Sequence, residues 1–210
     1  MEQHANFYSS LGSNYEDAFG ENPALLKFIE RALPYLPLKA NVLDVGCGTG
    51  KPVAMTQAAA GHSKAVLSGR FHLVDMKEYE PPSGPPFDVV FNILCLFALS
   101  RREIEDMAMR WSRWVRVGGI LCICSIPAED FQPETRGVGY DPDGLCARDI
   151  GYRFMATEVK ITLMTRKGWE KLLDRNGFEI LDTMTSAFTP PKEARSDDEV
   201  HYYIIAREVG

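Results

Sequence analysis

A glycine-rich turn between an apolar strand and a helix constrains the fold of this chain more than any other feature. The apolar run Val42–Val45 leads into Gly46, Gly48 and Gly50, and the helical stretch Lys51–Ala60 follows. Glycines let the backbone turn tightly and approach a ligand closely. The free N–H groups at the start of the helix can then donate hydrogen bonds to that ligand. The sequence therefore predicts an α/β fold with a ligand site at this turn.

Hydrophobic periodicity and turn residues divide the rest of the chain into further elements. Helices are expected at Asn22–Leu36, Lys51–Ala60, Arg102–Val115 and Arg166–Asn176. Strands are expected at Val42–Val45, Phe71–Asp75, Phe87–Asn92, Ile120–Ile126, Lys160–Met164, Phe178–Asp182 and His201–Ala206. Alternating strands and helices predict a three-layer Rossmann-like fold with a mostly parallel sheet, and the last two strands, joined only by a loop, predict an antiparallel edge strand. We expect a single domain over residues 1–210, with a helical cover at 1–40 and a lid or substrate loop at 127–156.

Composition excludes several classes of function. The 210 residues carry a formal net charge of -6, so a nucleic-acid-binding face is not expected. The N-terminus lacks the pattern of a signal peptide, and the longest apolar run, Val89–Leu99, is too short to span a membrane. Five cysteines, an odd number, predict reduced thiols and a cytoplasmic location. Cys122 and Cys124 are interpreted as buried thiols on one face of a strand, and no metal site is expected.

Several motifs resemble the class I S-adenosylmethionine-dependent methyltransferases that act on small molecules. The run from Val42 to Gly50 is similar to the first motif of that family, with Asp44 two residues before the first glycine. Phe87–Phe91 resembles its fourth strand, Trp114–Leu121 its turn into the fifth, and Lys167–Phe178 its last helix and the following turn. A nicotinamide-dependent oxidoreductase is disfavoured, because its glycine motif usually has a different spacing.

The resemblance implies a site for S-adenosylmethionine. The backbone at Gly46 and Gly48 would face the methionine portion and the ribose, and Asp44 would accept hydrogen bonds from the ammonium group. Asp75 would accept from the adenine amino group. The complete set of expected cofactor-binding residues is Tyr15, Asp44, Gly46, Cys47, Gly48, Thr49, Gly50, Asp75, Met76, Asn92 and Ile93. The alternatives are that Asp44 caps the loop, that Asp75 and Met76 are a turn aspartate and a core methionine, and that Asn92 satisfies a strand-end backbone group.

The chemistry of methyl transfer does not by itself identify a catalytic residue. Transfer from a sulfonium is an in-line displacement that depends on alignment. A general base is needed only for a weakly acidic hydroxyl or amine acceptor. His72, Tyr140 and His201 are candidates that no spacing distinguishes, so the catalytic residue stays unassigned. The acceptor pocket is expected beside the N-terminal segment, and its aromatic residues suggest an apolar small molecule or simple packing: Phe97, Phe131, Tyr140, Tyr152 and Phe154.

One segment of the family pattern is missing. The helix after the glycine turn should lead to a second strand that ends in a ribose-binding acid about 20 residues on. Here Gly61 is followed almost directly by Ser63–Arg70 and the expected strand Phe71–Asp75, so the sheet is expected to be one strand short. Phe71–Asp75 could keep the third-strand position and leave a gap. We favour the second arrangement, in which it fills the vacant second position and Asp75 binds the ribose.

These observations favour a methyltransferase that acts on a small molecule, and we expect that molecule to be a secondary metabolite. One alternative is a fold relative that does not methylate and instead catalyses a cyclisation or rearrangement, or only binds a ligand. Another is a defective shortened product. A missing strand would leave an open sheet edge, which invites pairing with another chain. A homodimer through that edge is therefore also predicted.

Overall fold

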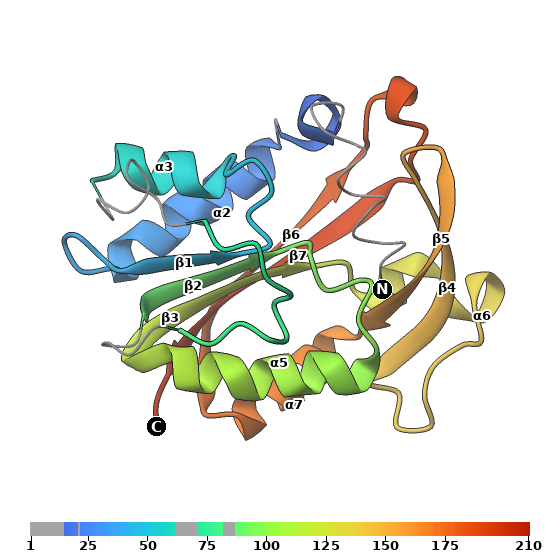
Figure 1. Ribbon diagram of the computed structural model, residues 1–210. Helices are drawn as coiled ribbons and strands as arrows, with labels where there is room; N and C mark the ends of the chain where they lie inside the picture. Colours follow the sequence, from blue (N-terminus) through green and yellow to red (C-terminus); the bar gives the residue numbers. More distant parts are fainter. Residues whose placement is uncertain (1–14, 21, 62–70, 82–86) are drawn as a thin grey trace.

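The computed structural model describes residues 15–20, 22–61, 71–81 and 87–210, and five strands form the central sheet of this part of the chain (Figure 1). These strands lie in the order β1-β2-β3-β7-β6. Their bounds are β1 Val42–Val45, β2 Phe87–Ile93, β3 Val115–Ser125, β6 Phe178–Phe188 and β7 Glu199–Glu208. The pairs β1–β2 and β2–β3 are parallel, whereas β7 runs antiparallel to both of its neighbours. The mostly parallel α/β sheet expected from the sequence is confirmed.

The antiparallel edge expected from the sequence is confirmed, and the structure adds which strand runs against the others. The closing pair β6–β7 does make one end of the sheet antiparallel, but the strand that runs against the others is β7, which lies second from the edge. β7 enters between β3 and β6 because its residues Tyr202–Ala206 are buried on both faces. A strand with two apolar faces is stable only inside a sheet that is covered on both sides.

Helices cover both faces of the sheet. α2 (Pro23–Ala32), followed by the turn η1 (Leu33–Tyr35), and α3 (Val53–Ala59) lie on one face, and α5 (Arg101–Trp114) and α7 (Arg166–Arg175) lie on the other (Figure 1). The side chain of Asn22 caps α2, accepting from the amides of Ala24 and Leu25. Ser100 caps α5 in a capping box with Glu103, and Thr165 caps α7.

The apolar faces predicted from helical spacing form the core. In α5 the buried residues are Ile104, Met107, Ala108, Trp111 and Trp114, and they pack with the side chains of α7 against the sheet. Cys122 and Cys124 are both buried on the opposite face, beside α2. Their interpretation as buried thiols on one face of a strand is confirmed.

A second sheet stands beyond the ends of the central strands. It is the hairpin of β4 (Cys146–Phe154) and β5 (Thr157–Met164), preceded by η2 (Ala128–Phe131) and α6 (Pro133–Arg136) (Figure 1). The sequence predicted a lid or substrate loop over residues 127–156 and no strand within it, so the whole of β4 was missed. A bulge between Ala147 and Ile150 shifts the register there, which interrupts the alternation that identifies a strand. The strand expected at Lys160–Met164 exists, but it belongs to this hairpin and not to the central sheet.

The strand expected at Phe71–Asp75 is wrong. In the described part of the chain these residues pair with no strand, and the side chains of Phe71 and Leu73 are exposed by 72% and 107%. Neither of the two predicted positions in the sheet is occupied by this segment, and β1 ends the described sheet. An apolar run forms a strand when neighbouring elements bury it. Here only the following residues are anchored, since Met76 and Tyr79 pack against the core on the α5 side.

Candidate active site

The glycine turn has the backbone geometry that the sequence predicts. Gly46, Gly48 and Gly50 have φ angles of 72°, 52° and 83°. Residues with a Cβ rarely adopt this positive-φ backbone conformation. Gly46 also has no room for a side chain. A Cβ there would lie 2.7 Å from the Cβ of Cys95 and 2.9 Å from its Sγ. The turn is therefore fixed both by its backbone conformation and by the close packing of Cys95, a residue that the sequence analysis did not single out.

Asp44 is a half-buried carboxyl group directly before this turn. It lies next to the end of β1, opposite Phe91 of β2. Within the described residues it accepts no hydrogen bond and forms no ion pair, so it does not act as a cap of the loop. Burial raises its pKa from 3.8 to about 7. A carboxyl group held in this state is suited to a cationic or hydrogen-bond-donating ligand, because binding would supply the partner that the protein does not.

Asn92 contributes a second polar group without a complete set of partners. It is fully buried near the end of β2, and its register partner in β1 is Val45. Its Oδ1 accepts from the Sγ of Cys95 at 3.3 Å, whereas its Nδ2 has no partner. The same Sγ lies 3.3 Å from the carbonyl oxygen of Val45. Burial raises the pKa of Cys95 to about 12, so the thiol stays protonated and can donate. One interpretation of the sequence was that Asn92 satisfies a backbone group at the end of the strand. The side chain of Asn92 instead contacts the thiol of Cys95.

The N-terminal segment meets the turn through an ion pair. Residues 15–19 are helical, and Glu16 accepts from the Nζ of Lys51 at 2.5 Å. Lys51, and then Thr49, lower the pKa of Glu16. Tyr15, an expected cofactor residue, stacks on Phe19 at 5.2 Å between ring centroids. The rest of the expected cover at residues 1–14 lies outside the described residues. Glu16 was missed because a single acid in a polar segment gives no sequence signal.

The structure does not bring Asp75 and Met76 to the turn. The Oδ1 of Asp75 accepts from the amide of Lys77 at 2.9 Å, and Met76 packs against the core on the α5 side of the sheet. Lys77 in turn donates to Glu103 of α5 at 2.8 Å. This is the arrangement of a turn aspartate followed by a core methionine. Within the described residues, no contact joins Asp75 to the glycine turn.

The three candidate bases lie in different surroundings. His72 is exposed and contacts the ring of Tyr79, and Tyr140 is half-buried at the base of the hairpin. His201 is 1% exposed at the start of β7 and forms hydrogen bonds with Glu199, Asn22 and Tyr203. Because its two ring nitrogens both contact groups of the chain, His201 faces no open space.

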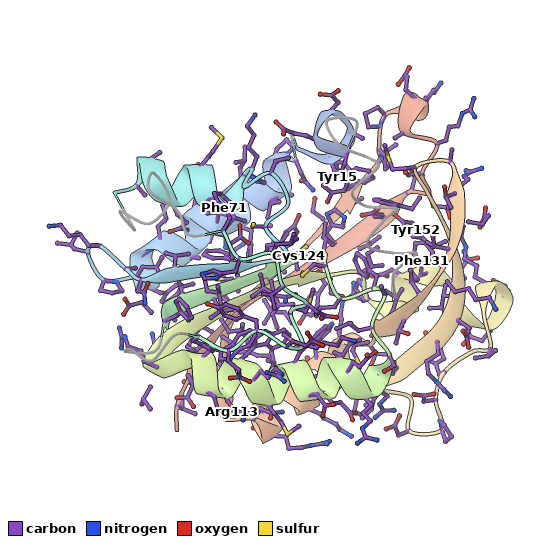
Figure 2. The ribbon with its side chains drawn as sticks, viewed as in Figure 1. Tyr15, Phe71, Arg113, Cys124, Phe131 and Tyr152 are labelled. Atoms are coloured by element: carbon purple, nitrogen blue, oxygen red, sulfur yellow. The ribbon has the colours of Figure 1, made fainter. Side chains whose placement is uncertain are left out.

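The aromatic residues expected around an acceptor do gather in one cluster. Phe131, Tyr152 and Phe154 pack together at the hairpin, with Phe97 and Tyr140 at the margin of the same cluster. Figure 2 shows Phe131 and Tyr152 on this side of the molecule, with Tyr15 above and Cys124 near the centre of the sheet. Phe19 and Phe188 complete the cluster, and the sequence analysis missed both. All of these side chains lie at the carboxyl ends of the parallel strands, where ligands bind in open α/β sheets.

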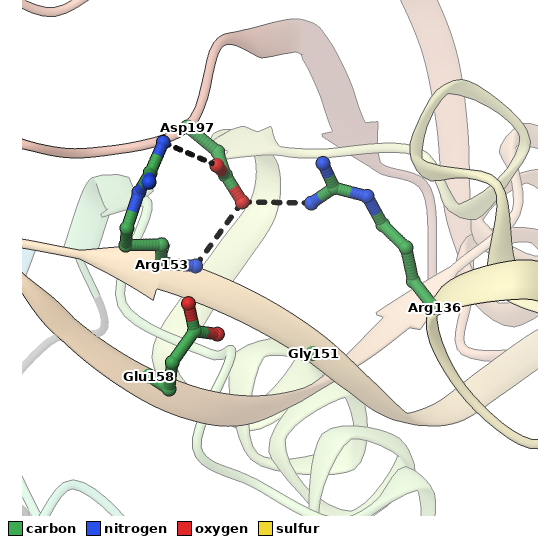
Figure 3. Close-up of a pocket in the computed structure, with 5 residues that line it drawn as sticks. All are labelled: Arg136, Gly151, Arg153, Glu158 and Asp197. Carbon is green, nitrogen blue, oxygen red and sulfur yellow. Dashed lines mark hydrogen bonds and ion pairs between the residues drawn. The ribbon is translucent and has the colours of Figure 1, made fainter.

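Two hollows at the surface lie on the hairpin side and not at the glycine turn. The first, of about 290 Å³, has Asp197 between two arginines: Arg136 donates to it at 2.7 Å, and Arg153 lies at 3.4 Å (Figure 3). The carboxylate of Asp197 neutralises much of the positive charge of the two arginines. These ion pairs therefore mainly connect the hairpin side to the β6–β7 loop. Within the described residues, no cluster of acidic, histidine or cysteine side chains could hold a metal ion, and no helix is long and apolar enough to cross a membrane.

Solved structures with a similar fold include methyltransferases. A Burkholderia thailandensis 1,6-didemethyltoxoflavin-N1-methyltransferase, solved with S-adenosylhomocysteine, has a TM-score of 0.65 and 18% identity over 100% of this chain and 90% of its own. A Synechocystis magnesium protoporphyrin IX methyltransferase has a TM-score of 0.60 and 15% identity over 90% of this chain and 83% of its own. A Methanosarcina mazei S-adenosylmethionine-dependent methyltransferase has a TM-score of 0.60 and 16% identity over 85% of this chain and 97% of its own.

Comparison with the curated proteins gives no match. At the identities above, the solved structures establish the fold alone. The family model described as a methyltransferase domain, however, matches residues 18–183, which is most of the sequence. That range begins in the helix whose Glu16–Lys51 pair reaches the glycine turn and ends in β6. The chain therefore belongs to the methyltransferase-domain family and has its Rossmann-like α/β fold.

Proposed function

We propose that this protein transfers a methyl group from S-adenosylmethionine to a small molecule, specifically a secondary metabolite. The observation that carries the proposal is the carboxyl group of Asp44, which lies beside the glycine turn without a partner among the described residues. Two similar structures were solved with S-adenosylhomocysteine, the product of such a transfer. One of them is a 1,6-didemethyltoxoflavin-N1-methyltransferase with 1,6-didemethyltoxoflavin bound, which supports a small molecule as the acceptor.

Each residue of the candidate site would have a binding role. Asp44 would accept from the ammonium group of the cofactor, and the backbone of Gly46, Cys47 and Gly48 would contact its methionine portion and ribose. The unpaired Nδ2 of Asn92 offers a donor at the end of the next strand, beside Ile93. Thr49 and Gly50 begin the helix, and Tyr15 lies in the helix above. For Asp75 and Met76 to reach the adenine, the segment that carries them would have to move.

The cofactor supplies the chemistry of transfer, since a sulfonium methyl group is electrophilic. The protein then has to align the acceptor with that methyl group and exclude water. The aromatic cluster around Phe131, Tyr152 and Phe154 provides an apolar environment for this purpose. A flat apolar acceptor would fit such rings better than a polar one.

Calorimetric titration with S-adenosylmethionine and S-adenosylhomocysteine tests the proposal. We expect micromolar binding at pH 8, where Asp44 is ionised. Asp44→Asn removes a charge-assisted hydrogen bond and should weaken binding by about 10- to 100-fold. Asp174→Asn, on the exposed side of α7, is the matched control and should bind normally. Failure of the wild-type protein to bind at millimolar ligand would refute the proposal.

A second candidate function is favoured by the edge of the sheet. β1 pairs only with β2 in the described residues, so no adjacent strand presents a ribose-binding acid. A fold relative that binds a ligand or catalyses a rearrangement without methyl transfer would tolerate this loss. The titration separates the two functions, because only the methyltransferase requires the cofactor.

We further propose that the protein is cytoplasmic and forms a homodimer through the edge of β1. The five cysteines of the chain, all free, support a reducing compartment. Exposed apolar side chains at Phe71 and Leu73 support an apolar contact near that part of the chain. Light scattering over a range of protein concentrations measures the mass in solution, and a constant mass of one chain would exclude the dimer.

A further inference from the structure

A chain of buried polar side chains runs from the hairpin to the start of α2. Tyr152 of β4 donates to Glu199 of β7, and the other carboxylate oxygen of Glu199 meets the Nε2 of His201. The Nδ1 of His201 lies 3.1 Å from the Nδ2 of Asn22, the N-cap of α2. These four residues are between 1% and 5% exposed. We refer to them below as the latch.

The chemistry of each group fixes the direction of these hydrogen bonds. The Oδ1 of Asn22 accepts from the amides of Ala24 and Leu25, at 3.0 and 3.3 Å, so its Nδ2 must face His201. Nδ1 of His201 therefore accepts, and Nε2 carries the proton that is donated to Glu199. The hydroxyl of Tyr203 lies 3.3 Å from the same Nδ1 and can donate to it as well. Every polar atom along this path has a partner.

Aromatic rings isolate the latch from solvent. The ring of Phe188 stacks on His201 at 5.3 Å, and Phe131 meets Tyr152 edge to face at 5.5 Å. Burying a carboxyl and an imidazole together is costly, and a well-packed apolar pair of the same volume often does as well for stability alone. In such surroundings a hydrogen bond is strong, and losing one partner leaves the next one unsatisfied. The hydrogen bonds among the four latch residues are therefore expected to form and to break together.

Both ends of the latch lead to candidate ligand surfaces. At one end, the β4–β5 hairpin carries the aromatic cluster expected to meet the acceptor. At the other end, Asn22 follows the helix at residues 15–19, whose Glu16 pairs with Lys51 of the glycine turn. Phe19 of that helix also touches Phe154 of the hairpin, at 5.3 Å between ring centroids.

We propose that the latch makes the hairpin and the segment from the helix at residues 15–19 to the first turn of α2 open and close as one unit, with Glu199 as the positioning residue between them. Given the proposed function, the helix at residues 15–19 would close over the cofactor at the same time as the β4–β5 hairpin closes over the acceptor. The latch residues do not touch the reacting atoms in this arrangement. They place the two surfaces that enclose those atoms.

Hydrogen exchange of the full chain, without ligand, tests the coupling. Tyr152→Phe removes only the hydroxyl at the hairpin end of the latch. We expect it to speed exchange about 10-fold or more in the hairpin and also at the amides of Ala24 and Leu25, at the opposite end. Tyr140→Phe removes a hydroxyl from the margin of the same aromatic cluster, outside the latch, and should leave those two amides unchanged. Faster exchange confined to the hairpin in Tyr152→Phe would overturn the proposal.

A second variant approaches the latch from the other end. Asn22→Ser keeps a side chain that caps α2 well but removes the amide that donates to His201. It should speed exchange in the hairpin, and the double variant Asn22→Ser/Tyr152→Phe should exchange no faster than the more affected single variant. If the two effects multiply instead, the sites act independently and the latch does not exist.

S-adenosylhomocysteine extends the test to the proposed function. In the wild-type protein, bound S-adenosylhomocysteine should slow exchange in the hairpin, whereas in Tyr152→Phe it should bind and leave the hairpin unprotected. Equal protection of the hairpin in both proteins would overturn the coupling. Absence of binding would refute the proposed function, and the ligand-free exchange of the variants would still decide the latch.

Discussion

Asp44 makes the stability of the protein depend on pH in a direction that a surface carboxyl group would not. Its pKa rises from 3.8 to about 7 on folding, because burial disfavours the charged form. The folded state therefore binds a proton more tightly than the unfolded state. The contribution to stability is complete below pH 3.8, declines as pH rises, and is lost once pH passes about 7.

The size of the effect follows from the shift. Each pKa unit corresponds to about 1.4 kcal/mol, so a shift of about three units gives roughly 4 kcal/mol as an upper figure. Asp44 is half-buried, and solvent screens part of this energy. Asp44→Asn removes the titrating group and keeps its shape. We expect the variant to gain about 2 to 4 kcal/mol over the wild type at pH 8 and about 1 kcal/mol or less at pH 4.5, where the unfolded state has already lost most of its proton.

Urea unfolding of both proteins at pH 4.5, 6, 7 and 8.5 measures this difference. Other titrating groups are common to the two proteins, so they cancel in the comparison. Asp174→Asn, an exposed carboxyl group on α7, is the control and should show no such trend. A stability difference between Asp44→Asn and the wild type that stays constant over this pH range would refute the reasoning.

Three further substitutions test particular contacts by urea unfolding. Gly46→Ala should cost about 2 to 4 kcal/mol, because a Cβ at this positive φ would lie 2.7 Å from the Cβ of Cys95; a neutral result would mean that the turn is not tightly packed. Gly168→Ala in α7 should destabilise by about 1 to 3 kcal/mol, although alanine normally favours a helix, because the new Cβ would lie 2.1 Å from a backbone oxygen; a gain in stability would contradict this packing. Glu103→Gln should cost about 1 kcal/mol at pH 7, since the hydrogen bond from Lys77 lowers the pKa of Glu103 to about 2. That stability is present above pH 4.5 and is lost as pH falls toward 2, so an equal cost at both ends of this range would exclude the ion pair as its cause.

The local elements could largely be predicted from the sequence. β1 has the bounds expected for it, and α5 begins and ends within one residue of the prediction. Asn22 and Thr165 cap the helices that follow them, which is the position where Asn and Thr side chains are favoured. These features depend on residues close in the chain: an apolar spacing, a cap, or a glycine at a turn.

The contacts between distant segments could not be predicted in this way. The apolar run Phe71–Asp75 predicts a strand, but the segment is exposed because no element of the described chain covers it. The alternation in β4 was hidden by a bulge. The sequence named His201 only as one isolated histidine, and it gave no sign of Glu199, its partner two residues earlier.

The sequence by itself determined the strand, the glycine turn and the helix of the candidate site, and through them the fold. Their signals are local, because the allowed backbone angles and the hydrophobic period depend on neighbouring residues. Only the tertiary structure decided that β7 lies between β3 and β6, that Cys95 fills the space behind Gly46, and that the hairpin meets α2 through Glu199. These arrangements depend on which surfaces remain to be buried once the elements exist, and burial is a property of the whole chain.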